Sequence, residues 1–279
     1  MPMPSLEKPA LEAVKPQSPV WKAIPRVHAL FTLREGGVSS GPFGGPDGFC
    51  GLNVGLYCGD AKSCVRMNRR ILADLAGSNP KWLHQVHGTE IVHGDDAAPE
   101  AEADGAWTAT PGVVLAVQTA DCLPVLLADA QGRAVMALHA GWRGLAAGIL
   151  QKGVAKLREE LPEGARILAW LAPRIGPEAF EVGEDVLEAM KALLPDAQSA
   201  FTAGNAPGKW MADLALLARQ ALEGAGIAPG DIEDCGLSTA ADAGRFFSYR
   251  RDAGETGRHA ALIWIETEKQ SEPEARPAP

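Results

Sequence analysis

Apolar runs bounded by glycine, proline or aspartate recur along the middle of the chain and predict its strands. These runs are rich in valine, leucine, isoleucine and aromatic residues, which favour a buried, pleated surface. The predicted strands are residues 27–34, 81–92, 112–122, 124–128, 134–139, 166–173 and 259–266. Most of them are nearly continuous in apolar character, which is typical of strands that are covered on both faces.

Longer segments with helical spacing lie between these strands. The predicted helices are residues 60–77, 144–161, 183–194 and 211–226. The first of them has Asp60 as an expected N-cap and Gly77 just past its end. Strands and helices follow no strict alternation and hairpins are present, so the pattern favours an α/β (α+β) fold with a mixed sheet covered by helices.

One folded unit accounts for the middle of the chain. Residues 1–19 and 268–279 are rich in proline, glutamate and lysine and are expected to be disordered tails. No linker of that composition and no internal repeat interrupts residues 20–267, which therefore predict a single domain. With 46% hydrophobic and 22% charged residues, this domain can bury a substantial core.

Charge and cysteine content narrow the classes of partner. The net charge of −9 and the absence of a Lys/Arg-rich run disfavour a nucleic-acid partner. No apolar run is long enough for a bilayer, and the first residues lack the apolar core of a signal peptide. Five cysteines without a CxxC pair do not form a disulfide framework, so we expect a soluble, cytoplasmic protein with no membrane partner and, by default, a monomer.

The segment "TADCLPVLLADAQGRAVMALHAGWRG" (residues 119–144) predicts a hairpin with a cysteine and a histidine at its outer ends. If the loop is centred on residues 130–131, Cys122 faces His139 across the two strands. Directly opposed residues of this kind have Cβ atoms about 4.5–5.5 Å apart. That distance suits a thiolate–imidazole hydrogen bond or two ligands of one metal ion, whereas a lone buried cysteine is usually only a small hydrophobic residue.

A third ligand can come from "WLHQVHG". Alternation along a strand places His84 and His87 on opposite faces, and we select His87 because it precedes a glycine at the strand end. His87, Cys122 and His139 are thus the candidate catalytic and metal-binding residues. This donor set suits Zn²⁺ with an open fourth position, and copper is a possible substitute. A metal-free Cys122–His139 hydrolase and a noncatalytic binding module remain open alternatives.

Other polar residues are candidates for anion and substrate binding. Arg143 lies in "AGWRG", where a glycine-flanked turn runs into a helix, and Arg34 and Arg250 lie at strand ends. The alternative for the arginines is ordinary surface pairing. The glycine-rich stretch 34–55 contains Asn53 and lacks P-loop spacing, and we interpret it as an ordered loop lining a site. Asp121 could orient a ligand, although strand alternation points it away from Cys122.

A series of motifs gives a family resemblance. "TLREGGVSSGPF", "QVHGTE", "TADCLPVLL", "HAGWRG", "IGPEAFEVG" and "FFSYRRD" resemble, in this order, the YfiH-type laccase-domain family over about residues 25–266. That family has been labelled polyphenol oxidase and is also known as a purine nucleoside phosphorylase family. The resemblance implies one domain of four layers, α/β/β/α, in which two mixed β-sheets pack between helices, similar to some cysteine hydrolases.

The resemblance also implies a chemistry. It assigns zinc ligands to His87, Cys122 and His139, and phosphorolysis of adenosine, inosine, guanosine and S-methyl-5'-thioadenosine with some adenosine deamination. Phosphate would attack C1′ of the ribose while the purine leaves, with cations such as Arg34 holding the phosphate. Ser238 stands where relatives usually have cysteine, and no metal ligand is lost by this departure. The count of six histidines disfavours a self-contained four-copper laccase site, and copper-dependent polyphenol oxidation with a single copper in the His87–Cys122–His139 set stays open as a further alternative.

Overall fold

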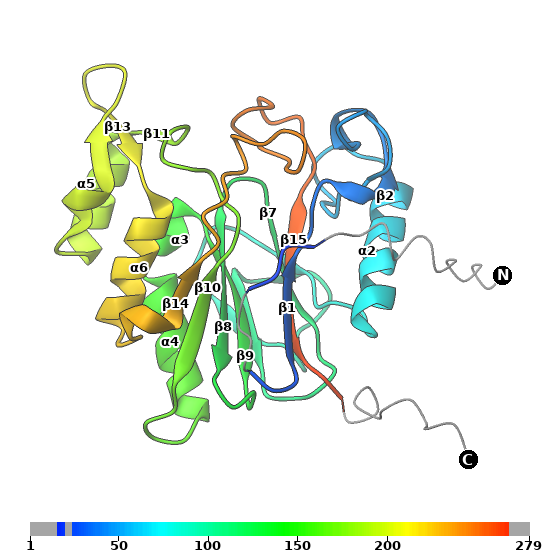
Figure 1. Ribbon diagram of the computed structural model, residues 1–279, viewed down its shortest axis with the longest axis horizontal. Helices are drawn as coiled ribbons and strands as arrows, with labels where there is room; N and C mark the ends of the chain where they lie inside the picture. Colours follow the sequence, from blue (N-terminus) through cyan, green and yellow to red (C-terminus); the bar gives the residue numbers. More distant parts are fainter. Residues whose placement is uncertain (1–15, 20–23, 268–279) are drawn as a thin grey trace, which may run out of the picture.

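Two β-sheets lie face to face in the middle of the molecule, and helices cover the outer face of each (Figure 1). The computed structural model describes residues 16–19 and 24–267. The large sheet has the order β14 (Ile232–Asp234), β10 (Ile167–Leu171), β8 (Leu123–Asp129), β9 (Val135–Ala140), β6 (Gly105–Thr108) and β4 (Ile91–His93). The small sheet has the order β1 (Val27–Phe31), β15 (His259–Ile265) and β7 (Leu115–Thr119).

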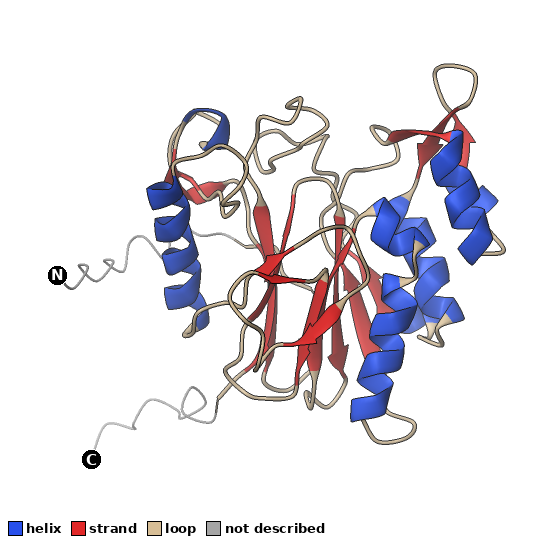
Figure 2. Ribbon diagram, turned by 180° about the vertical axis from the view of Figure 1, so that it is seen from behind, coloured by secondary structure: helices blue, strands red, loops and turns tan. Residues whose placement is uncertain are grey.

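The helices fall into two groups on opposite sides of this sandwich (Figure 2). The large sheet is covered by α3 (Trp142–Ala146), α4 (Ile149–Glu160) and α6 (Leu214–Gly224), with α5 (Glu184–Leu193) packed beside α3. The small sheet is covered by α2 (Lys62–Ala76). The remaining strands are β2 (Glu35–Ser39), the pair β3 (Leu83–His84) and β5 (Ala101–Glu102), and the small sheet of β11 (Glu181–Gly183), β13 (Lys209–Ala212) and β12 (Phe201–Ala203).

Three apolar cores fill the three interfaces between the four layers. In β8, Leu123, Val125 and Leu127 face the helices, whereas Leu126 and Ala128 face the small sheet. Both faces of this strand are therefore dry, which explains its unbroken apolar sequence. The four-layer α/β/β/α prediction is confirmed. The large sheet is mixed, but the small sheet is antiparallel throughout.

The hairpin of β8 and β9 forms, but its predicted register is wrong. His139 pairs with Pro124 instead of Cys122, because the connection holds four residues rather than two. The Asp129 carboxylate builds this longer loop by accepting the backbone N–H groups of Gln131 and Arg133, both at 3.2 Å. A displacement of two residues keeps every side chain on its original face, so His139 still points as the sequence predicts.

Three other local predictions are also corrected. Residues 81–92 do not form one strand, because the backbone turns between β3 and β4 with a left-handed φ of 61° at His87. The helix predicted at 144–161 breaks into α3 and α4 at Gly148, whose φ is 86°. Asp60 does not cap α2; its Oδ2 accepts hydrogen bonds from Ser39 and Asn53 in the glycine-rich segment instead.

The chain termini fall partly outside the described residues, so the predicted tails 1–19 and 268–279 are described only at residues 16–19. There Gln17 pairs with Phe31 through two backbone hydrogen bonds of 2.9 and 2.7 Å. This part of the predicted tail is therefore ordered, because β1 is an edge strand with free backbone groups. Within the described ranges, no helix combines the length and apolar character that crossing a bilayer requires.

Buried His259 predicts a loss of stability in acid. Its ring lies among Phe31, Phe246 and Phe247, with centroids 4.9, 5.8 and 5.1 Å away, and burial lowers its pKa from 6.5 to about 3. The unfolded chain takes up this proton as the pH falls below about 6.5, whereas the folded chain resists it down to about pH 3. In this window the group should lower the free energy of unfolding by up to about 1.4 kcal/mol per pH unit.

Urea unfolding between pH 7 and pH 4 measures this effect. The variant His259→Gln should be less stable at pH 7 but should lose stability less steeply toward pH 4. An equal slope in both proteins would contradict the assignment to His259.

Candidate metal centre

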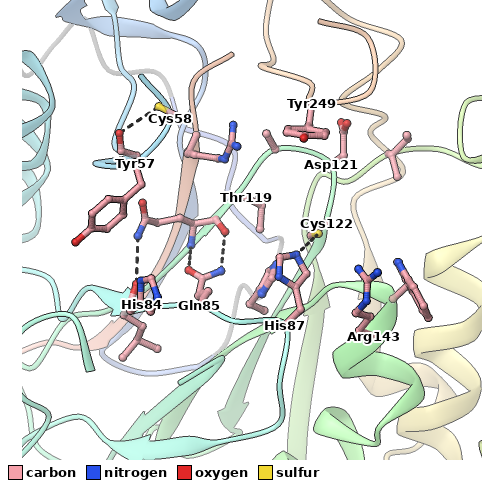
Figure 3. A pocket seen from close by; sticks show the side chains of 18 of the residues that line it. Tyr57, Cys58, His84, Gln85, His87, Thr119, Asp121, Cys122, Arg143 and Tyr249 are labelled. Atoms are coloured by element: carbon pink, nitrogen blue, oxygen red, sulfur yellow. Dashed lines mark hydrogen bonds between the residues drawn. The ribbon is translucent and has the colours of Figure 1, made fainter. Parts of the chain in front are cut away.

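Two imidazoles and a thiol converge at one end of the intersheet layer. One potential ligand atom from each of His87, Cys122 and His139 lies within 4.8 Å of the others, and no other group of this kind occurs in residues 16–19 and 24–267. The Cys122 Sγ is 3.8 Å from the His87 Nε2. A dashed line marks this contact in Figure 3. The two imidazole rings lie 4.8 Å apart at an angle of 77°. His139 is buried and His87 is exposed, so the cluster has one closed and one open side.

A buried carboxylate fixes the two histidines. Asp104 lies directly before β6 and is fully buried. One of its oxygens accepts from the backbone N–H of His87 at 2.9 Å and contacts His139 Nδ1 at 2.7 Å. The other accepts from the N–H groups of Val86 at 3.1 Å and Gly88 at 2.6 Å. Because Nδ1–H of His139 donates to Asp104, Nε2 keeps its lone pair for a metal.

Asp104 was missed among the candidate residues. Its signal in the sequence is an acidic residue between Ala103 and Gly105, directly before the short strand Gly105–Thr108. Such a carboxylate must be satisfied when it is buried, and here it organises both the left-handed turn at His87 and the ring of His139.

Two glycines allow the segments of the cluster to approach one another. A Cβ atom at Gly141 would lie 2.8 Å from His87 Cδ2 and 3.1 Å from Cys122 Sγ. At Gly144, a Cβ would lie 2.8 Å from the Gly88 carbonyl oxygen. The glycines of "HAGWRG" therefore provide room at the cluster, since an alanine at either position would push α3 away from the His87 turn.

The electrostatics of the cluster suit a cation. Burial raises the pKa of the Cys122 thiol, but His139 and His87 outweigh it and lower this pKa to about 6. Burial lowers the pKa of His139, but the Cys122 thiolate and Asp104 raise it to about 9. Cys122 and His139 therefore favour each other's charged form, thiolate and imidazolium, and a metal cation would replace the imidazolium proton.

The donor set fits a metal with an open coordination position. Thiolate and imidazole are ligands that zinc and copper both accept, and three protein ligands are typical of a catalytic zinc site. The open side of the cluster faces a cavity of about 570 Å³. The same low thiol pKa also suits a nucleophilic cysteine, so the geometry alone leaves both chemistries available.

Two of the four predicted substrate-binding residues line this cavity, namely Arg143 and Arg250. The guanidinium of Arg143 stacks on Trp142 at 4.5 Å. Arg250 donates through Nη1 to the carbonyl oxygens of Ala179 and Glu181, both at 3.1 Å. The two arginines come from α3 and from the loop before β15, and Arg258 is a third cavity residue that the sequence interpretation missed.

The other two predicted residues have different surroundings. Arg34 donates to the carbonyl oxygens of Gly44 and Ala243, and it does not line the cavity. Asn53 is fully buried and also lies outside the cavity lining. Its side chain bonds to Asp60 and to the backbone of residues 55 and 258, so it joins the glycine-rich segment to the loop before β15.

Asp121 has a role that strand alternation did not foresee. Its φ of 89° turns the chain before Cys122, and its carboxylate accepts from Thr239 Oγ1, Ser248 Oγ and the Arg250 backbone N–H at 2.6, 3.0 and 2.7 Å. It therefore anchors the loop that presents Arg250 to the cavity.

Known proteins are similar to this chain in sequence and fold. Residues 28–266 match the family described as multi-copper polyphenol oxidoreductase laccase. A purine nucleoside phosphorylase of Pseudomonas aeruginosa is 44% identical over 89% of this chain and 98% of its own length. The purine nucleoside phosphorylase YfiH of Escherichia coli is 43% identical over 88% of this chain and 97% of its own length.

Solved structures agree with the sequence comparison. A protein of Neisseria meningitidis superposes with a TM-score of 0.82 at 41% identity, covering 90% of this chain and 99% of that one. YlmD from Geobacillus stearothermophilus gives a TM-score of 0.78 at 32% identity, covering 88% of this chain and 94% of that one. The chain therefore belongs to the YfiH-type laccase-domain family.

Proposed function

We propose that this protein is a zinc-dependent purine nucleoside phosphorylase. Its substrates would be adenosine, inosine, guanosine, S-methyl-5'-thioadenosine and inorganic phosphate, with deamination of adenosine as a side reaction. The observation that carries the proposal is the His87–Cys122–His139 cluster at a cavity lined by three arginines, Arg143, Arg250 and Arg258. The names of the relatives that are 43–44% identical over almost their full length support the substrate class.

In the proposed phosphorolysis, a bond from C1′ of the ribose to phosphate replaces the bond from C1′ to the purine. An oxygen of HPO₄²⁻ forms a bond to C1′ while the C1′–N9 bond breaks and its electron pair goes to the purine. The proton of the phosphate ends on the released base, so the products are ribose 1-phosphate and the free purine. A zinc ion held by His87, Cys122 and His139 would supply Lewis acidity here.

The protein's own groups position the reactants. Arg143 and Arg250 carry positive charge to the cavity wall, where a dianion can be bound. Asp104 holds the His139 ring in one orientation, and Asp121 holds the loop that carries Arg250. Binding both substrates in one cavity of about 570 Å³ supplies proximity, which is a large part of the rate enhancement.

Phosphate dependence tests the reaction type. Purified protein with inosine should release hypoxanthine only when phosphate is present, with an equal amount of ribose 1-phosphate. Equal release without phosphate, giving free ribose, would contradict phosphorolysis. The low pKa of Cys122 would then favour a Cys–His hydrolase.

The arginines predict a selective effect on phosphate. Arg143→Ala should raise the KM for phosphate about 10- to 100-fold, because it removes one charge-assisted contact worth roughly 1.5–3 kcal/mol. The KM for inosine should change much less. Steady-state kinetics with each substrate varied in turn measure this, with exposed Arg70→Ala on α2 as a matched control. An unchanged KM for phosphate in Arg143→Ala would remove Arg143 from the phosphate site.

Copper-dependent oxidation of polyphenols is the alternative that the family's description raises. A multicopper site needs several imidazole-rich centres, whereas only three of the six histidines line the cavity and only two of those join the cluster. Oxidation of a phenol by copper-loaded protein at a rate above inosine phosphorolysis would favour that alternative.

A further inference from the structure

The cavity extends well beyond the metal-binding cluster. On one side of His87 and Cys122 it reaches Arg143, and on the other it reaches Tyr57 and His84, as Figure 3 shows. We call the second part the aromatic arm and define it by Tyr57, His84, Glu100 and Gln118, all of which line the cavity. The two parts differ in chemistry: one presents cations, and the other presents rings, an amide and a carboxylate.

The aromatic arm contains polar atoms that lack partners. Glu100 Oε2 is buried and makes no hydrogen bond with the residues that the structure describes, and the same is true of Thr119 Oγ1 at the cavity wall. The other oxygen of Glu100 accepts from Arg69 Nη1 at 2.6 Å, and Glu100 has a left-handed φ of 54°. A carboxylate held in a rare backbone conformation with one free oxygen is typical of a binding site.

Gln118 adds a loosely held amide. Its Oε1 accepts from Arg69 Nη2 and its Nε2 donates to the Leu83 carbonyl oxygen, each at 3.4 Å. By contrast, the neighbouring Gln85 side chain is locked to the backbone of Gln118 by bonds of 2.7 and 2.8 Å. Bonds of 3.4 Å are long, so the Gln118 amide can exchange them for a ligand at small cost.

Tyr57 offers an uncovered aromatic face. Tyr57 is 73% exposed. Its ring lies at an angle of 84° to the His84 ring, and the two ring centroids are 5.8 Å apart. The chain has two tyrosines in all, Tyr57 and Tyr249, and both line this cavity. An exposed ring beside free polar atoms matches a flat ligand that has hydrogen-bonding edges.

Resting on the proposed function, we propose that the aromatic arm binds the purine base. The base would stack on Tyr57, and an N–H on its six-membered ring would donate to Glu100 Oε2. Phosphate must approach C1′ from the side opposite the leaving base, which places phosphate beside Arg143 and the ribose across the metal centre. Adenine, hypoxanthine and guanine all carry an N–H donor on that ring or its substituents, whereas the unsubstituted base of purine riboside carries none.

Equilibrium binding of inosine and purine riboside tests this assignment. Dissociation constants are measured by calorimetry on zinc-loaded protein without phosphate, so turnover does not interfere. Wild type should bind inosine about tenfold or more tightly than purine riboside, because one hydrogen bond to a charged acceptor is lost. Glu100→Gln should lose most of this preference. Tyr57→Ala should weaken both ligands about tenfold through lost stacking, and Tyr57→Phe should bind better than Tyr57→Ala.

Controls separate this inference from the proposed function and from misfolding. Phe49→Ala removes an exposed ring outside the cavity and should leave both dissociation constants unchanged. Glu100→Gln also weakens the ion pair with Arg69, so the melting temperature of this variant is compared with that of wild type. If Glu100→Gln unfolds, Tyr57→Ala still tests the proposal, because it changes only an exposed ring. If wild type phosphorolyses inosine but Tyr57→Ala binds both nucleosides as wild type does, the assignment of the arm is wrong. If wild type phosphorolyses no nucleoside, the proposed function itself is wrong.

Discussion

Cys122→Ala should lose bound zinc and, with it, phosphate-dependent release of hypoxanthine. Cys122 is the one anionic ligand of the set, and its thiolate is already favoured because His139 and His87 lower its pKa to about 6. Loss of a residue that merely supports a ligand typically costs about 10–100-fold in metal affinity, so loss of the thiolate itself should cost at least about 100-fold. Metal analysis and single-turnover assays on the same preparation measure both effects.

The matched control is Cys64→Ala. Cys64 is a half-buried free cysteine on α2 and does not line the cavity, so its replacement should leave zinc content and turnover unchanged. Stoichiometric zinc in Cys122→Ala, bound as tightly as in wild type, would show that Cys122 is not a ligand.

Asp104→Asn should weaken zinc binding about 10–100-fold even though Asp104 is not a proposed ligand. Four donors converge on its two oxygens: three backbone N–H groups of residues 86–88 and the Nδ1 of His139. An asparagine offers only one acceptor oxygen, so its amide N–H₂ would face two of these donors. The expected cost is about 1–3 kcal/mol of stability for the buried groups left without a partner, in addition to the lost metal affinity.

Asp129→Asn separates the two effects. Asp129 is also fully buried, but it holds Arg133 and the loop of the β8–β9 hairpin at the other end of the strands. This variant should lower the melting temperature without changing the zinc dissociation constant. If Asp104→Asn and Asp129→Asn both lose stability and neither loses zinc affinity, Asp104 has no role in positioning the ligands.

The buried strands were predictable because burial on both faces leaves continuous apolar runs in the sequence, whereas the arrangement of two sheets in four layers was implied only by the family resemblance. Apolar runs such as residues 124–128 and 134–139 identify strands that are covered on two sides. The hairpin register was not predictable from the apolar pattern, because it depends on the loop that the Asp129 carboxylate holds through the backbone N–H groups of Gln131 and Arg133. The register prediction was wrong by two residues, which leaves His139 on the same face of its strand. The prediction that Cys122 and His139 lie close together therefore did not depend on the exact register.

The surroundings of the cluster depended on contacts between segments far apart in the sequence. Arg34 and Asn53 are plausible ligand-binding residues by type, but each also bonds to a residue about 200 positions away, which no local pattern reveals. Asp104 and the free oxygen of Glu100 were equally hidden, because their roles depend on the turn at His87 and on Arg69. Local sequence patterns identify residues whose chemistry suits a site, and tertiary contacts determine which of these residues lie in the site.

The central claim is that bound zinc and phosphorolysis belong to the same site. The most direct test measures inosine phosphorolysis on protein that has been fully demetallated and then titrated with zinc. We predict that demetallated protein is inactive and that activity returns in proportion to zinc up to one equivalent per chain. Full phosphorolysis by demetallated protein would contradict this account.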